Sequence, residues 1–432
     1  MKLLKIRTIT VMLLVIGAGL VFAAGGKQDG ASGGGKKQVL TFLTDKDTNF
    51  VGPQAIIDAF EKKYDVTVEV EVRQGGTEGD NIIKTRLATG DMADVFGYNT
   101  GALLSAINPE RNILDLTNES YANNFDNSFL TAASVNGRLY AVPWRTAAGG
   151  GWLYNKKVYR ELGLAVPRTW AELLSNLEKC KAAGKTGVIG SYKDTWTSQI
   201  IVLADEYNVK AGNPNFPAEY TAGKAKYANT PAALRSFQKY TETRPYLNSD
   251  FMATTYNDAI EILVSGQGVH WPMLTDVLNN IYALHPDKID DIGVFGQPGD
   301  DPNNQGLTVW ATGGVYVYKN SPNLELAKKF LEFYVSEEGV KAYIAASKPD
   351  GPFHIKGIAL PDDVYGGVKD MLPYFNNGRT APALEFESPV KGPNLEQICV
   401  EVGSGNISPQ EAAATYDADV KKQAIQLGLP GW

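Results

Sequence analysis

Alternating apolar and polar positions divide the first part of the chain into short strands and amphipathic helices. Residues 39–43 form an apolar run, and residues 66–72 alternate valine with polar residues, which is the period of a strand. A third apolar run at 93–96 predicts another strand. Residues 53–64 and 81–89 place apolar side chains at helical spacing. Strands separated by helices predict parallel sheets with helices on both faces.

The same signals continue through the rest of the chain. Asn136-Gly137 is typical of a hairpin turn. Two capping boxes, Thr169 with Glu172 and Ser408 with Glu411, predict the first turns of two helices. A strand is expected at 315–318, followed by a helix at 324–334. The pattern therefore predicts an α/β protein from end to end.

The N-terminus has the pattern of a secretory signal peptide, residues 1–23. Three cations within residues 2–7 precede an apolar run at 9–22, which is short for a bilayer span of ~20 residues. Small or aliphatic residues at −3 and −1, Val21 and Ala23, favour cleavage after Ala23, and an uncleaved membrane anchor is the alternative. No cysteine lies near the cut, so we expect no lipid. Residues 24–38 are rich in glycine and lysine, which predicts a flexible tether. The signal peptide predicts that the mature protein lies in the periplasm or another extracytoplasmic space.

Composition excludes several classes of function. About 400 mature residues exceed one hydrophobic core, so two lobes are expected. Without the three signal-peptide cations, 38 basic and 48 acidic residues remain, a net charge of about −10 that disfavours nucleic acid as a partner. Cys180 and Cys399 favour two buried thiols, with one disulfide as the alternative. The three histidines have no metal-ligand spacing, and we expect neither metal nor cofactor.

Several short phrases occur in order along the chain: TRLATGD at 85–91, ADVF at 93–96, YAVPW at 140–144, WLYNK at 152–156, PRTW at 167–170 and LAKKFL at 326–331. Together these phrases resemble the substrate-binding subunits of bacterial ABC sugar importers. They keep the order and rough spacing of extracellular solute-binding family 1, which includes maltose-binding proteins, and they cover nearly the whole mature chain. The family's lipid-attachment cysteine is missing here.

The resemblance implies a two-lobed periplasmic-binding-protein fold of type II, each lobe a mainly parallel sheet flanked by helices. One lobe would comprise residues 39–148 and 313–346, the other 149–312 and 351–432. A carbohydrate, expected to be an oligosaccharide, would bind in the cleft as the lobes close on a hinge. The protein would then act as a monomer, without catalysis, and deliver the sugar to ABC transporter permease subunits in the inner membrane.

A sugar has an apolar C–H face and a rim of hydroxyls, so its site needs flat aromatic rings beside polar side chains. Trp196 follows the predicted strand 187–190, and ligands of α/β sheets lie at the carboxyl ends of strands. Trp271 lies where the resemblance implies an aromatic presented to the sugar. Each candidate could instead serve packing or lie in a solvated loop. The candidate ligand-binding residues are Asp45, Asn99, Trp144, Arg145, Asp194, Trp196, Trp271, Trp310 and Arg379.

Two other classes of protein stay open. An exported glycoside hydrolase would need two carboxylates flanking the scissile bond, and none of the 48 acidic residues lies in a recognisable catalytic motif. A binding protein for iron, a polyamine or a peptide is the second alternative. The aromatic loop residues favour a sugar over these solutes.

Overall fold

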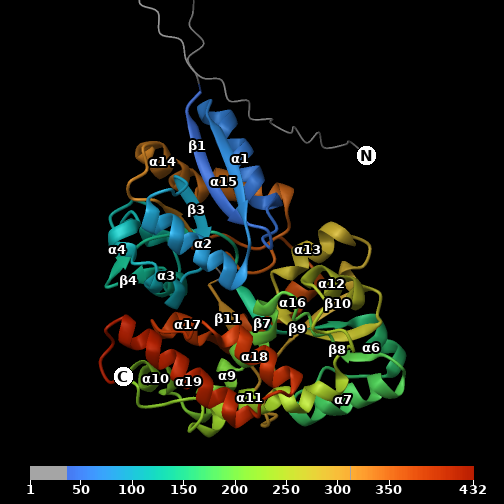
Figure 1. The fold of residues 1–432 in the computed structure, drawn as a ribbon. Helices are drawn as coiled ribbons and strands as arrows, with labels where there is room; N and C mark the ends of the chain where they lie inside the picture. Colours follow the sequence, from blue (N-terminus) through green and yellow to red (C-terminus); the bar gives the residue numbers. More distant parts are fainter. Residues whose placement is uncertain (1–36, 312) are drawn as a thin grey trace, which may run out of the picture. The chain divides into compact units, whose positions relative to one another are not determined.

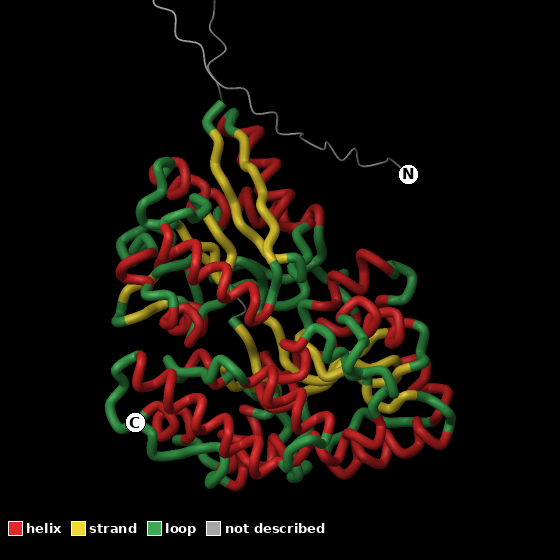
Figure 2. Tube along the Cα trace, viewed as in Figure 1, coloured by secondary structure: helices red, strands yellow, loops and turns green. Residues whose placement is uncertain are grey.

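Two separate β-sheets organise the residues that the structure describes (Figures 1 and 2). The structure is a computed structural model that describes residues 37–311 and 313–432. The predicted signal peptide and nearly all of the predicted tether lie outside the described residues. Each sheet has its own buried core, so we call each sheet with its helices a lobe.

The first lobe is built on a five-stranded sheet of order β2-β1-β3-β12-β6. Its strands are β1 (Val39–Asp45), β2 (Thr67–Arg73), β3 (Val95–Tyr98), β6 (Val142–Pro143) and β12 (Gly314–Val317). Its helices are α1 (Val51–Tyr64), α2 (Gly76–Thr89), α3 (Ala102–Ala106), α4 (Pro109–Asn112), α5 (Asn127–Ala132), α14 (Leu324–Tyr334) and α15 (Glu337–Ala346). A two-stranded hairpin, β4 (Ser134–Val135) and β5 (Arg138–Leu139), turns at Asn136-Gly137 with positive φ at both residues, as predicted.

The second lobe is built on a six-stranded sheet of order β13-β11-β7-β9-β8, with β10 also paired to β7. Its strands are β7 (Ala148–Asn155), β8 (Thr186–Val188), β9 (Gly268–Leu274), β10 (Ile292–Gly296), β11 (Leu307–Trp310) and β13 (Thr380–Pro382). Its helices are α6 (Lys156–Leu162), α7 (Trp170–Ala182), α8 (Ile200–Leu203), α9 (Glu206–Gly212), α10 (Phe216–Thr221), α11 (Pro231–Thr243), α12 (Tyr256–Val264), α13 (Val277–Leu284), α16 (Gly366–Asn376), α17 (Leu384–Glu387), α18 (Leu395–Ser404) and α19 (Pro409–Gln426).

The predicted two-lobed α/β class is confirmed, but both sheets are mixed rather than mainly parallel. β1 runs parallel to β2 and β3, whereas β12 runs antiparallel to β3 and β6. In the second sheet β7 is antiparallel to β9, β10 and β11. The chain leaves the first sheet through β6 and β7 and returns through β11 and β12. Because these outgoing and returning strands lie side by side, they must run in opposite directions.

The lobe boundaries stay a prediction, and one segment near them contacts the first lobe. Lys356 N donates to Asn124 O at 2.7 Å, and Asp126 N donates to His354 O at 3.0 Å. His354 Nδ1 also lies 2.8 Å from Asp126 Oδ2. Residues 354–356 therefore lie against the first lobe, beyond the predicted boundary at 351.

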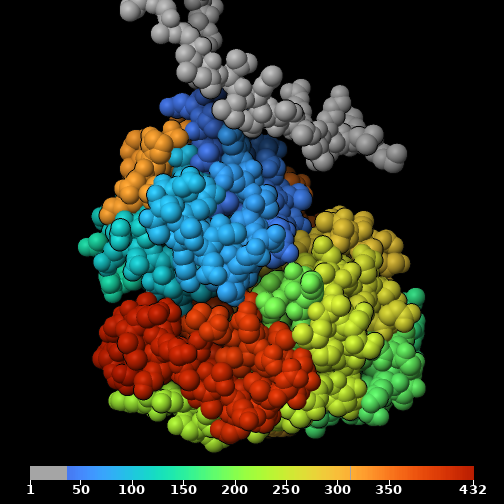
Figure 3. All heavy atoms as spheres, viewed as in Figure 1, coloured from blue at the N-terminus to red at the C-terminus, as the bar shows by residue number. Residues whose placement is uncertain are grey.

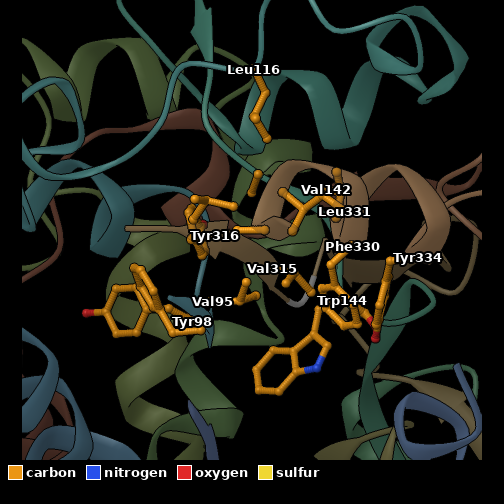
Figure 4. Packing of buried hydrophobic residues seen from close by; sticks show 14 of the residues in the cluster. Val95, Tyr98, Leu116, Val142, Trp144, Val315, Tyr316, Phe330, Leu331 and Tyr334 are labelled. Carbon is orange, nitrogen blue, oxygen red and sulfur yellow. The ribbon is translucent and has the colours of Figure 1, made fainter. Parts of the chain in front are cut away.

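Aromatic side chains pack among aliphatic ones in the core of the first lobe (Figure 4). Tyr316 of β12 stacks on Phe96 of β3, with ring centroids 5.3 Å apart. Trp144, which directly follows β6, is 2% exposed, and its carbonyl oxygen accepts a hydrogen bond from Tyr334 at 3.0 Å. Fully burying one large apolar side chain contributes about 1.5–3 kcal/mol, so this cluster stabilises the lobe independently of any ligand.

The predicted helix starts and buried thiols appear in the structure. Ser408 and Glu411 form a complete capping box at α19. Thr169 caps α7 through Glu172 N, whereas the Glu172 carboxylate accepts from Arg168 N, so this box is half formed. Cys180 and Cys399 are free and buried, and burial raises the pKa of their thiols to about 11 and about 12.

Gly150 in β7 makes room for an indole ring. A Cβ at Gly150 would lie 2.0 Å from the Trp310 ring, which belongs to the neighbouring strand β11. Trp310 is 5% exposed, and its Nε1 donates to Glu385 Oε1 at 2.8 Å. The Trp310 ring thus packs against Gly150 and is fixed by its hydrogen bond to Glu385. Moving the ring to make room for a side chain at position 150 would break that hydrogen bond.

A buried carboxyl joins two of the segments that connect the lobes. Ala147 N donates to Pro352 O at 2.7 Å. Thr146 Oγ1 donates to Asp350 Oδ1, and Asn279 Nδ2 donates to Asp350 Oδ2 at 2.7 Å. Burial is the main cause that raises the pKa of Asp350 to about 7; the Asp276 charge adds to it, and the Thr146 bond opposes it.

Replacing Asp350 with asparagine should change how stability depends on pH. The folded pKa of about 7 lies above the ordinary 3.8, so folding favours the protonated carboxyl. Between these values unfolding releases a proton, and the free energy of unfolding falls by up to about 1.4 kcal/mol per pH unit as pH rises. Urea titrations from pH 4 to 8 should show a shallower fall for Asp350→Asn. Parallel curves for variant and wild type would contradict the raised pKa.

Gly150→Ala should destabilise the protein by about 1–3 kcal/mol, because the new methyl group overlaps the Trp310 ring. Gly366→Ala is the matched control. Its Cβ would meet only Lys156 Nζ, at 3.3 Å, which is the far end of a flexible side chain that pairs with Asp370. Thermal unfolding of both variants tests this, and equal melting temperatures would show that β7 tolerates a side chain at this position.

Candidate ligand-binding cleft

A pocket lies between the lobes, with walls from both. The first lobe contributes residues at and after the ends of β1, β2 and β3. The second lobe contributes the short 3-10 helix Thr195–Gln199, the start of α12 and residues between 385 and 396. In Figure 3 the blue segment carrying α2 meets the red C-terminal segment on the visible face. The cavity measures about 220 Å³. A single water needs at least about 10–15 Å³, so the cavity has room for a small molecule rather than a single ion.

Three aromatic rings form one side of the second-lobe wall. The Trp196 and Tyr256 ring centroids are 5.7 Å apart, and both residues line the pocket. Trp271 lies behind Tyr256 at 5.4 Å, is 1% exposed, and donates from Nε1 to Ser191 Oγ at 3.2 Å. Trp271 therefore supports the ring surface, whereas Trp196 and Tyr256 present it to the cavity.

Trp310, Glu385 and Lys391 form a hydrogen-bonded chain in the wall. Trp310 Nε1 donates to Glu385 Oε1 at 2.8 Å, and Lys391 Nζ lies 2.9 Å from Glu385 Oε2. Burial lowers the pKa of Lys391, but the Glu385 carboxylate outweighs it and the pKa is raised. The pair thus stays charged and offers fixed donors and acceptors.

A second ion pair joins the lobes at the base of the pocket. Arg145 Nη1 lies 3.0 Å from Asp276 Oδ2. Burial lowers the pKa of Arg145, but the charges of Asp276, Asp45 and Asp350 raise it overall. The guanidinium also lies 4.9 Å from the centroid of the Trp144 ring. Arg145 is therefore a fixed cation with a carboxylate on one side and an indole on the other.

The first-lobe wall carries charged groups around the start of α2. Arg73 at the end of β2 donates from Nη1 to Gln74 O at 2.7 Å, and its guanidinium lies 5.9 Å from the Tyr98 ring. Burial raises the pKa of Asp80, although the nearby cations Lys84, Lys391 and Arg73 lower it. This wall can therefore exchange hydrogen bonds with a ligand rich in hydroxyls.

The structure brings five of the nine predicted site residues to the pocket: Asp45, Asn99, Arg145, Trp196 and Trp310. Asp45 also orders the loop after β1, because its Oδ1 accepts from Asp47 N and from both Thr48 N and Thr48 Oγ1. Without a bound ligand, a ligand contact for these residues stays a prediction.

The other four predicted residues lie outside the pocket lining. Trp144 packs in the first-lobe core, and Trp271 lies behind Tyr256. Asp194 accepts from Tyr256 N at 2.8 Å. Arg379 lies before β13, where its carbonyl accepts from Leu307 N and its guanidinium lies 5.9 Å from the Tyr374 ring.

Sequence reasoning missed several pocket residues. Arg73 directly follows the alternating valines of β2. Because ligands of α/β sheets bind at the carboxyl ends of strands, this position could have been predicted from the sequence. Tyr256, Gln199, Glu385, Lys391 and Glu396 reach the pocket from helices and loops with no local signal for ligand binding. Their positions follow from how distant segments pack.

The described residues carry two further findings. Among residues 37–311 and 313–432, no group of three or more His, Cys, Asp or Glu side chains could hold a metal ion. Within these same ranges, none of the helices combines the length and apolar character that crossing a membrane requires.

Comparison with known proteins places the chain in a family. Residues 47–341 match the family described as bacterial extracellular solute-binding protein. The chain is 26% identical over 302 residues to a multiple sugar-binding protein of Streptococcus mutans, covering 65% of this chain and 67% of that one. It is 23% identical over 344 residues to the melibiose/raffinose/stachyose-binding protein MelE of Bacillus subtilis, covering 74% and 75%.

Solved structures share the fold. The solute-binding protein RafE in complex with raffinose superposes with a TM-score of 0.74 at 20% identity, covering 89% of this chain and 99% of that one. The apo form of RafE from Streptococcus pneumoniae superposes with a TM-score of 0.66 at 20% identity, covering 91% of this chain and 100% of that one. The family match spans well over half of the chain, and the two-lobed fold with its cleft agrees with it. The chain belongs to the family of bacterial extracellular solute-binding proteins.

Proposed function

We propose that this protein is the substrate-binding subunit of an ABC importer and that it captures a carbohydrate, specifically an oligosaccharide. The observation that carries the proposal is the Trp196–Tyr256 ring surface in a cleft whose other walls are charged. Two relatives named as sugar-binding proteins and the fold shared with a raffinose complex support it. Two adjacent aromatic rings beside charged hydrogen-bonding groups suit the apolar face and the hydroxyl rim of a sugar.

The geometry suggests how a sugar is held. The apolar face of one ring packs on Trp196 and Tyr256, while hydroxyls meet the ion pairs Arg145–Asp276 and Lys391–Glu385. Both pairs are already charge-balanced, so a neutral ligand enters without leaving an uncompensated charge. Closing of the lobes then buries the sugar, and the closed monomer presents it to the membrane permease.

We infer binding without catalysis, because family members and relatives are solute-binding proteins. A calorimetric panel of mono- and oligosaccharides, run beside a glycosidase assay on the same sugars, separates the two classes. Saturable heat of binding without new reducing ends supports a carrier. Turnover of any bound sugar would make the protein a hydrolase.

We also propose that the exported form starts near Ala24 and carries no lipid. The support is the basic and apolar pattern of residues 1–23 with no cysteine near the cut. Intact-mass analysis of protein from the native host should show the cleaved, unmodified chain. A diacylglycerol adduct or a retained Met1 would overturn this.

Trp196→Ala should weaken sugar binding about five- to thirtyfold. Stacking a sugar ring on an indole removes on the order of 50–80 Å² of apolar surface from water, worth roughly 1–2 kcal/mol at ~25 cal/mol per Å². The half-buried position of Trp196 means that the melting temperature without ligand should change little. Calorimetry and thermal unfolding measure both quantities.

Trp432→Ala is the matched control. Trp432 is also half-buried but packs on Tyr220 of the second lobe and is absent from the pocket lining. This variant should bind sugar like the wild type. Normal affinity together with a large loss of stability in Trp196→Ala would assign Trp196 to packing.

A further inference from the structure

The loop that follows β1 contacts the second lobe at two points. Lys46 Nζ lies 3.3 Å from Asp194 Oδ1, and Asn280 Nδ2 lies 3.4 Å from Asp47 O. Lys46 and Asp47 belong to the first lobe, whereas Asp194 and Asn280 belong to the second. Both contacts therefore cross the cleft beside the pocket.

The two second-lobe partners also hold Tyr256 at both of its ends. Asp194 uses its other oxygen, Oδ2, to accept from Tyr256 N at 2.8 Å. Asn280 donates from the same Nδ2 to Tyr256 OH at 2.7 Å. Burial raises the pKa of Tyr256 well above its ordinary value, so the hydroxyl stays neutral and accepts this bond. One ring of the pocket wall is thus fixed by the two residues that reach the opposite lobe.

We propose that Lys46, Asp194 and Asn280 form a clamp that couples lobe closure to the placement of the Tyr256 ring. These are positioning residues, and the inference rests on the proposed carrier function. When the lobes approach, Lys46 and Asp47 engage Asp194 and Asn280. These residues in turn hold Tyr256 against Trp196, where a ligand ring would stack.

The charges around Lys46 make the clamp weak and reversible. Lys46 Nζ also lies 3.5 Å from Asp47 Oδ1 in its own lobe. Burial lowers the pKa of Lys46, but the charges of Asp47 and Asp194 raise it overall. On opening, Lys46 keeps Asp47 as a partner and loses only Asp194. The closed state therefore has only one ion pair more than the open state, Lys46 with Asp194. This small advantage permits the lobes to reopen and release the ligand to a permease.

Lys46→Met tests the clamp with raffinose as the probe. Methionine keeps an apolar stem but removes the cation. Exposed ion pairs contribute about 0.2–1 kcal/mol, so binding should weaken about 1.4- to fivefold, mainly through faster dissociation. The difference should shrink in 1 M salt, which screens charges beyond about 3 Å. Lys63→Met is the matched control, because Lys63 is as exposed as Lys46 and its ion pair with Glu338 lies within the first lobe.

A double-mutant cycle and a measurement without ligand complete the test. In an Asp194→Ala background, Lys46→Met should have no further effect on raffinose affinity, because its partner is gone. Hydrogen exchange of the Tyr256 amide in the ligand-free protein should be faster in Asp194→Ala than in Lys63→Met, because Asp194 accepts a hydrogen bond from that amide. Additive effects, or unchanged exchange, would overturn the clamp. Absence of sugar binding in the wild type would instead overturn the carrier function, and the exchange data would still decide the clamp.

Discussion

The paired crossing of the chain between its two sheets is the constraint on which the pocket depends. β6 and β7 leave the first sheet as β11 and β12 return to it, and residues opposite each other include Ala148 with Trp310 and Pro143 with Gly314. Because the two crossings lie side by side, residues 144–148 and Trp310 gather at one place. The wall residue Trp310 is therefore fixed by strand pairing, and Arg145 lies in the short connection between the paired strands β6 and β7.

Burial of charge is the second constraint on the cleft. A buried ion is costly unless it is paired, and the desolvation of a pair is offset only by good geometry. Arg145 with Asp276 and Lys391 with Glu385 satisfy this condition at 3.0 Å and 2.9 Å. The first pair joins the lobes and the second fixes Trp310 through Glu385. The cleft can thus be polar enough for hydroxyls and still remain ordered without ligand.

The sequence determined the elements and the class of fold. The helix at 324–334 has the predicted bounds, and the Asn136-Gly137 hairpin and the Ser408 capping box form as local chemistry requires. These features depend on neighbours within a few residues, so a single sequence contains the information. The same holds for Asp45, the last residue of β1, and for Asn99 and Trp196, which follow β3 and β8; all three line the pocket.

Tertiary structure decided the rest. Sequence pattern could not show that β7 and β12 run antiparallel to their neighbours, because direction depends on which distant strands pair. Nor could it show that Asp194 holds Tyr256, 62 positions away, or that Lys391 lies beside Glu385 in the pocket wall. Local periodicity specifies which face of an element is apolar. Which residues meet across a cleft depends on the packing of whole lobes, and that information is spread over the entire chain.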